Sequence, residues 1–252
     1  MFVTNYYHDK ILSIMAAFNQ NQEYVLREYR GQASLPTFID LYRVSTDTVR
    51  EVIFDGIEMT TRFAKRSFDI LFSSVIMLLG LPIFLTVLLI TKLSSKGPAF
   101  YKQERIGRNG IPFYIYKFRS MIVESEVNGP QTTSDDDPRI TPWGNIMRKT
   151  HLDELPQFWN VLKGEMSIVG PRPERAFFIR QITEKAPAYW KLLALKPGIT
   201  SIGQVGYGYA ENVDQMVERM KLDLGYLQEV NILTDLEIIF KTVGTMIGGK
   251  GK

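Results

Sequence analysis

The hydrophobic pattern of the chain contains one long uninterrupted apolar run. Residues 70–90, ILFSSVIMLLGLPIFLTVLLI, carry no charged side chain. As a helix this segment would be about 30 Å long, which matches the hydrocarbon core of a bilayer. A buried core helix is the alternative, but a charge-free run of this length is uncommon in a domain of this size. The pattern therefore predicts membrane insertion.

Two features of this run bear on how it enters a membrane. Gly80 and Pro82 lie near its middle, and a kink is expected at Pro82 because proline removes a backbone hydrogen bond. Both flanks are basic, and positive residues favour the cytoplasmic side. The flanking cations are Lys65, Arg66, Lys92, Lys96 and Lys102. Two alternatives stay open at this point: a re-entrant helix-break-helix with both ends cytoplasmic, and a kinked span.

The remaining pattern predicts a mostly helical α+β fold with one small β-hairpin. Two aromatic runs within residues 98–122 flank the turn sequence GRNG, which is typical of a hairpin. Helical periodicity occurs in several other segments, and turn-forming residues mark the loops. The predicted helices are 45–64, 153–163, 211–228 and 232–247, and the predicted loops are 128–144 and the glycine-rich 196–210.

Composition and charge narrow the classes of function. The chain has 252 residues, of which 45% are hydrophobic and 23% charged, so it can bury a sizeable core. It has no cysteine, which excludes disulfides, thiolate metal sites and a cysteine nucleophile. Residues 1–64 carry a net charge of −2 and residues 65–252 a net charge of +5. The excess of positive charge in residues 65–252 suits anionic ligands or an anionic membrane face, and it does not require a nucleic acid partner. The N-terminus shows no secretory signal pattern.

The candidate chemistry lies in an acidic pair among basic residues. Asp153 and Glu154 are adjacent, so on a helix they point about 100° apart and would take different roles. A carboxylate can attack phosphorus, and arginines and a divalent ion, Mg²⁺ above all, can neutralise phosphate charge. The candidate phosphate-binding cations are Arg148, Arg172, Arg175, Lys117 and Arg119.

Each of these signals also has a structural explanation. An acidic pair at a helix N-terminus favours the helix dipole, and GPRP can be simply a rigid turn. His151 is one of two histidines. It is a candidate base, although a structural or solvent-facing role fits it better.

Several motifs in order resemble the bacterial sugar transferase family, the monotopic polyprenyl-phosphate phosphoglycosyl transferases. The resemblance covers roughly residues 64–245 and rests on KRSFDI, the apolar run with its central proline, YKQERIGRNGIPFYIYKFRSM, DPRIT, RKTHLDELPQFWNVLKGEMSIVGPRP and KPGIT. Family members often have serine before the break proline, where this chain has Leu81.

The resemblance implies an enzyme that moves a sugar-1-phosphate from a UDP-sugar to undecaprenyl phosphate and releases UMP, by a Mg²⁺-dependent ping-pong mechanism. In this family the acidic pair Asp153 and Glu154 would form a catalytic dyad. Asp153 would be the nucleophile, and Glu154 would help Asp153 to hold the metal ion. Arg148 and Arg172 would bind phosphate. The resemblance also favours the re-entrant alternative, broken at Pro82, at the cytoplasmic face of a bacterial inner membrane.

The implied organisation has three parts: an N-terminal extension (1–64), a re-entrant hairpin (65–97) and a cytoplasmic catalytic domain with amphipathic interfacial helices (98–252). Residues 1–64 are candidates for regulation or for pairing protomers in a homo-oligomer. Two other functions use the same residues: a membrane-bound phosphohydrolase, and a non-enzymatic scaffold that recruits assembly proteins through its basic face. The sequence does not select the sugar or the glycan pathway.

Overall fold

The computed structural model describes residues 59–123, 125, 131–132 and 137–247. Most of the helix predicted over residues 45–64 lies outside the described residues, and so does part of the predicted loop 128–144. The domain limits inferred from the sequence stay predictions.

The apolar run forms two helices that meet at a sharp bend. α3 spans Met59–Leu79, α4 spans Leu81–Ser94, and the two are bent by 64°. The break falls at Gly80, so the expectation of a break at Pro82 is wrong by two residues. Pro82 sits in the first turn of α4, where its missing N–H breaks no helical hydrogen bond. A Cβ atom at position 80 would lie 2.5 Å from the carbonyl oxygen of Ile76, which explains why the junction is a glycine.

Neither helix is a membrane span by itself. Within the described part of the chain, no single helix combines the length and hydropathy needed to cross a bilayer, whereas the bent pair α3 and α4 meets both conditions when taken together.

The predicted β-hairpin is confirmed. β1 (Phe100–Ile106) pairs antiparallel with β2 (Pro112–Phe118), with Phe100 opposite Phe118. The connecting turn contains the short 3-10 helix η1 (Arg108–Gly110). Asn109 has a φ of 57°, a left-handed conformation that asparagine tolerates better than most residues. The local turn signal was therefore sufficient to predict this element.

A second, parallel pair of strands was not predicted. β3 (Ser167–Val169) pairs with β4 (Gly198–Thr200), and α8 (Ile202–Tyr207) follows directly. The interpretation of residues 196–210 as a glycine-rich loop is therefore wrong. A Cβ at Gly198 would collide with the backbone of Gly170, so glycine here serves close strand approach rather than loop flexibility.

The remaining helices surround the two small sheets. The predicted helix over 211–228 is confirmed as α9, and two apolar residues of this helix, Met216 and Met220, are buried in a cluster with Ile179 and Ile182. The predicted helix over 232–247 is confirmed as α10, although only part of its apolar surface is core: Phe240 is exposed. These helices are α5 Pro142–Lys149, α6 Gln157–Lys163, α7 Ala176–Lys185, the 3-10 helix η3 Pro187–Ala194, α9 Val213–Tyr226 and α10 Ile232–Ile247.

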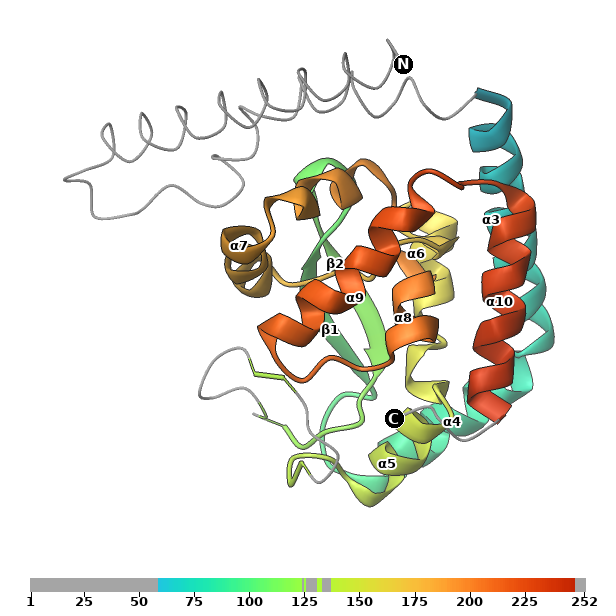
Figure 1. Ribbon diagram of the computed structural model, residues 1–252. Helices are drawn as coiled ribbons and strands as arrows, with labels where there is room; N and C mark the ends of the chain where they lie inside the picture. Colours follow the sequence, from blue (N-terminus) through green and yellow to red (C-terminus); the bar gives the residue numbers. More distant parts are fainter. Residues whose placement is uncertain (1–58, 124, 126–130, 133–136, 248–252) are drawn as a thin grey trace, which may run out of the picture.

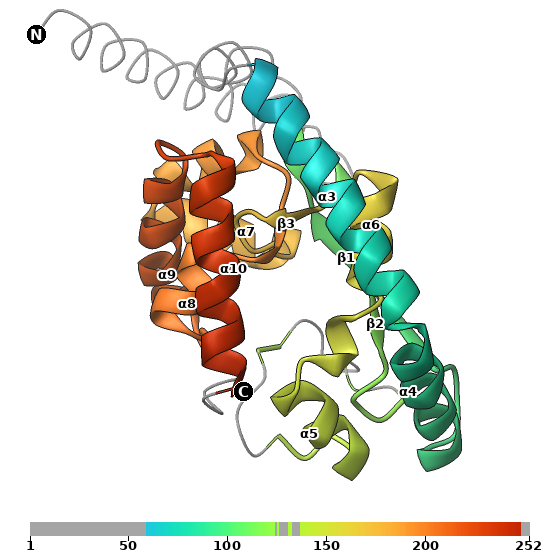
Figure 2. The ribbon, with the colours of Figure 1, turned by 90° about the vertical axis from the view of Figure 1, so that its right-hand side faces the viewer.

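A buried polar network fastens the first helix to the rest of the fold. Figure 1 places α3 and α10 at the same edge of the molecule, and Figure 2 shows that edge from the front. Lys65 of α3 donates hydrogen bonds to the carboxylate of Asp235 in α10 and, at 2.9 Å, to the carbonyl of Val169. One turn along α3, Asp69 accepts a 2.9 Å bond from the Ile168 N–H. These bonds hold the start of the apolar helix pair in register with β3.

Candidate functional site

The acidic pair lies in a tight turn rather than in the predicted helix. Asp153 and Glu154 belong to the short 3-10 helix η2 (Leu152–Glu154), and α6 begins only after Pro156. The predicted helix start at residue 153 is therefore wrong. An α-helix starting there would need a hydrogen bond from the backbone N–H of residue 156 to the carbonyl of Leu152, and Pro156 has no N–H. His151, just before η2, adopts a left-handed φ of 55° that redirects the chain out of α5.

This turn buries both carboxylates. The exposed fraction is 5% for Asp153 and 8% for Glu154. A solvated helix N-terminus would leave such side chains in water, so the structural explanation of the pair does not hold here. Two adjacent buried carboxylates are costly unless cations stand close to them.

Two cations from distant parts of the chain supply that compensation for Glu154. Lys117 in β2 donates a 2.5 Å hydrogen bond to Oε1 of Glu154, and Nη2 of Arg172 lies 3.9 Å from the same oxygen. Burial by itself would raise the pKa of Glu154, but the charges of Lys117 and Arg172 outweigh it and hold this pKa at about 2. Glu154 is therefore ionised throughout the physiological range.

Asp153 responds differently to the same surroundings. Burial raises its pKa to about 6, with Lys117 opposing the rise, Glu154 adding to it and Arg148 opposing it. The two neighbours thus have pKa values pushed apart, which is typical of carboxylates with distinct roles in one site. Near neutral pH, Asp153 is an ionised carboxylate in a poorly solvated place, a condition that favours reaction with an electrophile.

The predicted basic residues fall into two groups. Lys117, Arg148 and Arg172 gather at the dyad; Arg148 lies in the last turn of α5 and lowers the pKa of Asp153. The guanidinium of Arg119 donates to the carbonyl and hydroxyl oxygens of Ser95, at 2.7 and 2.6 Å, and so ties the hairpin to the end of α4. Arg175 lies at the N-terminal boundary of α7.

Tyr209 belongs to the site, and the sequence analysis did not identify it. The guanidinium carbon of Arg172 lies 5.7 Å from the centre of the Tyr209 ring, and the His151 ring stacks on the same tyrosine at 6.5 Å. Burial raises the pKa of Tyr209 to about 12, so the phenol stays protonated. The only local signal was a tyrosine beside glycines in GYGYA, which is also typical of a plain turn.

A second buried group of ion pairs holds the loop that carries Arg172. The sequence analysis did not identify this group either. Glu174 pairs with Arg219 of α9 and, at 3.4 Å, with Arg105 of β1. Arg105 also donates a 3.0 Å bond to the carbonyl of Pro173, and Asp223 accepts a hydrogen bond from the backbone N–H of Arg172. These contacts fix the GPRP turn and hence the position of the arginine.

The dyad is compatible with a divalent cation. Among the described residues, no group of three or more histidine or acidic side chains is arranged to hold a metal. Mg²⁺, however, is commonly held by one or two carboxylates, with water and substrate phosphate completing its coordination. Asp153 and Glu154 offer that donor set, and a phosphate ligand would supply the rest.

Comparison with known proteins identifies the group to which this arrangement belongs. The family model described as Bacterial sugar transferase matches residues 60–249, which is most of the chain and includes the dyad, the GPRP turn and the bent helix pair. The chain belongs to the bacterial sugar transferase family. This confirms the resemblance inferred from the ordered motifs.

Three relatives of this chain illustrate the match. It is 41% identical over 189 residues to the UDP-N-acetylgalactosamine-undecaprenyl-phosphate N-acetylgalactosaminephosphotransferase of Aeromonas hydrophila, covering 75% of this chain and 45% of that protein. It is 41% identical over 185 residues to the UDP-glucose:undecaprenyl-phosphate glucose-1-phosphate transferase of Escherichia coli (strain K12), covering 72% and 40%. It is 40% identical over 195 residues to the exopolysaccharide production protein PSS of Rhizobium leguminosarum bv. phaseoli, covering 74% and 97%. The matched segment thus spans less than half of the first two relatives.

Proposed function

We propose that this protein transfers a sugar-1-phosphate from a UDP-sugar to undecaprenyl phosphate and releases UMP. Such a step would begin a capsule, O-antigen, exopolysaccharide or glycoprotein glycan. The observation that carries this proposal is the buried dyad, in which Glu154 stays ionised beside an Asp153 of raised pKa, with Lys117, Arg148 and Arg172 around it. Relatives named for this reaction support the choice of substrates.

The reaction would proceed in two displacements at one phosphorus. In the first, an oxygen of the Asp153 carboxylate attacks the phosphorus that bears the sugar; the bond to the UMP oxygen breaks, and UMP leaves. In the second, an oxygen of undecaprenyl phosphate attacks the same phosphorus. The acyl phosphate bond then breaks and restores the Asp153 carboxylate.

The remaining side chains would bind and orient the phosphates. Arg172 and Arg148 present fixed guanidinium donors that suit phosphate oxygens. Lys117 keeps Glu154 ionised, and Glu154 and Asp153 are the residues that would hold Mg²⁺. When bound, this ion would neutralise phosphate charge.

The bent pair α3 and α4 would serve as a re-entrant membrane element with both ends on the cytoplasmic side of the inner membrane. Apolar side chains are exposed along both helices, among them Leu71, Leu78, Ile83 and Leu89. In Figure 1 the junction of α3 and α4 lies at the same edge as α10, whose Phe240 is also exposed. An apolar edge of this kind would bring the dyad to the lipid headgroups, where the acceptor phosphate lies.

The experiment is a measurement of UMP release by the full chain in nanodiscs, with Mg²⁺, undecaprenyl phosphate and a panel of UDP-sugars. The panel includes glucose, galactose, N-acetylglucosamine and N-acetylgalactosamine. Asp153→Asn is the test variant, and Asp214→Asn, at an exposed carboxylate, is the matched control. Release that needs the lipid and one donor, and that disappears only in Asp153→Asn, supports the transferase and identifies its sugar.

Two other outcomes would favour the competing functions. UMP release without the lipid acceptor would indicate a phosphohydrolase, with water as the second nucleophile. Folded protein that releases no UMP with any donor would favour the scaffold. A radiolabelled sugar retained on the wild-type protein without the lipid, and absent from Asp153→Asn, would support the covalent intermediate and hence the ping-pong order.

A further inference from the structure

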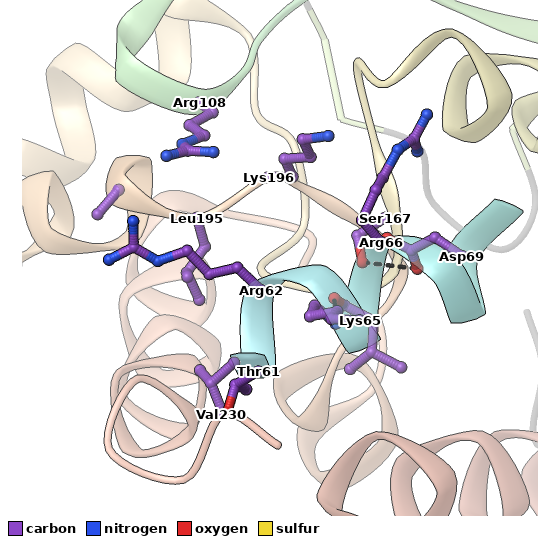
Figure 3. A pocket seen from close by; sticks show the side chains of 12 residues that line it. Thr61, Arg62, Lys65, Arg66, Asp69, Arg108, Ser167, Leu195, Lys196 and Val230 are labelled. Carbon is purple, nitrogen blue, oxygen red and sulfur yellow. Dashed lines mark hydrogen bonds between the residues drawn. The ribbon is translucent and has the colours of Figure 1, made fainter. Parts of the chain in front are cut away.

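A basic cavity lies apart from the dyad, at the start of the apolar helix pair. Its volume is about 280 Å³, and it is bounded by α3, the η1 turn, β3 and the segment that leads into β4 (Figure 3). None of the residues that gather at the dyad lines it. The ionisable side chains that line it are Arg62, Lys65, Arg66, Asp69, Arg108 and Lys196.

The charge of this lining is strongly unbalanced, with five cations and one carboxylate. Some of these charges already have partners: Lys65 pairs with Asp235, and Arg66 donates to the carbonyl oxygens of Val161 and Leu162 at 2.7 and 2.9 Å. The Asp235 carboxylate offsets the charge of Lys65, whereas the carbonyl oxygens leave the charge of Arg66 uncancelled, so the lining keeps a net positive charge. The cavity is therefore a preformed region of positive potential.

Among the cations of this cavity, Lys196 has the surroundings that most strongly favour the binding of an anion. Within the described residues it forms no ion pair and no hydrogen bond, although it is partly buried. A side-chain carbon at Gly164 would come within 4 Å of both the Lys196 ammonium and the Arg66 guanidinium, so the two cations converge. Burial, followed by the charge of Arg66, lowers the pKa of Lys196. An anion placed between the two would remove this repulsion.

We propose that this cavity is a second, non-catalytic binding site for a phosphate group. Phosphate matches converging guanidinium and ammonium donors better than a carboxylate does, because it has more acceptor oxygens and more charge. Apolar residues such as Leu195 and Val230 also line the cavity, so the group attached to the phosphate can be apolar. The phosphate can belong to an anionic phospholipid beside α3 or to a soluble phosphate compound, and the experiment separates these sources.

The first arm measures the binding of radiolabelled inorganic pyrophosphate to the purified full chain by equilibrium dialysis. We expect two sites in the wild type, one at the dyad and one in the cavity. Lys196→Gln is expected to weaken one site by about tenfold or more, as for the loss of one charge-assisted hydrogen bond, and to spare the other. Arg172→Gln is expected to do the reverse.

The second arm measures the binding of fluorescent phosphatidylglycerol in mixed micelles, with phosphatidylcholine as the uncharged competitor. Lys191→Gln is the matched control, because Lys191 lies five residues away and does not line the cavity. Lys196→Arg keeps the charge and should retain binding. Loss in Lys196→Gln with the lipid alone identifies a phospholipid headgroup site, and loss with pyrophosphate identifies a soluble ligand.

The proposal is overturned when folded Lys196→Gln binds both probes as tightly as the wild type does. Misfolding is not expected to obscure this result, since Lys196 forms no hydrogen bond or ion pair with the described residues that the substitution could break. An unchanged thermal midpoint without ligand would verify it. Sugar transfer is measured separately. A normal transfer rate, together with no binding of either probe in the cavity, would reject this site without affecting the proposed function.

Discussion

At the scale of single residues, the environment of Asp153 favours reactivity at the expense of stability. Its pKa of about 6 lies above the ordinary value of 3.8, so the folded protein binds this proton more tightly than the unfolded chain does. The protonated form is therefore favoured by folding. This stabilisation is present below about pH 4 and is lost as the pH rises through about 6.

Asp153→Asn should consequently be inactive and yet at least as stable as the wild type near neutral pH. Thermal unfolding at about pH 5 and about pH 7.5 checks this, with Asp214→Asn as the exposed control. We expect the stability advantage of Asp153→Asn over the wild type to grow between these two pH values. An Asp153→Asn protein that is less stable than the wild type at the higher pH would contradict a burial-raised pKa.

Lys117 is expected to set the acidic limit of activity. Its charge lowers the pKa of both carboxylates, so Lys117→Gln should raise both. The acidic limb of the pH–rate profile should then move to higher pH, with a loss of about tenfold or more near pH 6 that shrinks at about pH 8. Lys163→Gln, at an exposed lysine paired with Glu165, should leave the profile unchanged. A loss in Lys117→Gln that is equal at every pH would point to substrate binding alone.

At the scale of elements, the bend between α3 and α4 predicts a specific membrane topology. Because the chain has no cysteine, single cysteines introduced at the exposed positions Ala64 and Lys96 report the two ends separately. A re-entrant pair leaves both cysteines inaccessible to a membrane-impermeant maleimide in spheroplasts and accessible in inverted vesicles. If one of the two reacts in spheroplasts, the pair is a kinked span.

At the scale of the whole molecule, the link between α3 and α10 should contribute a large part of the stability. Asp235 is fully buried and accepts hydrogen bonds from Lys65 and Tyr226. Asp235→Asn should lower the free energy of unfolding by about 3 kcal/mol, because it leaves the partly buried ammonium of Lys65 without its counterion. Glu237→Gln, two residues along the same helix in an exposed pair with Lys241, should cost less than about 1 kcal/mol.

Chemical denaturation of both α10 variants in detergent measures the difference. Equal effects would mean that the buried link is dispensable and that apolar packing alone holds α3 against the domain.

The sequence by itself determined the elements whose signals are local. The charge-free run 70–90 predicted the apolar helices, GRNG predicted the hairpin turn, and the helical periodicity of residues 211–228 predicted α9. The ordered motifs also identified the family and pointed to the dyad residues. Periodicity, turn chemistry and motif order are properties of neighbouring residues, so they can be read without coordinates.

The tertiary structure alone decided what depends on residues far apart in the chain. It placed Glu154 beside Lys117 and Arg172, brought Tyr209 onto Arg172, and paired β3 with β4. It also showed that Arg119 donates a hydrogen bond to Ser95 at the end of α4 and does not join the cations at the dyad. Burial and ion pairing set the ionisation of a carboxylate, and both arise only when distant segments pack together. For that reason Asp153 and Glu154, adjacent and chemically similar in the sequence, become different groups only in the folded protein.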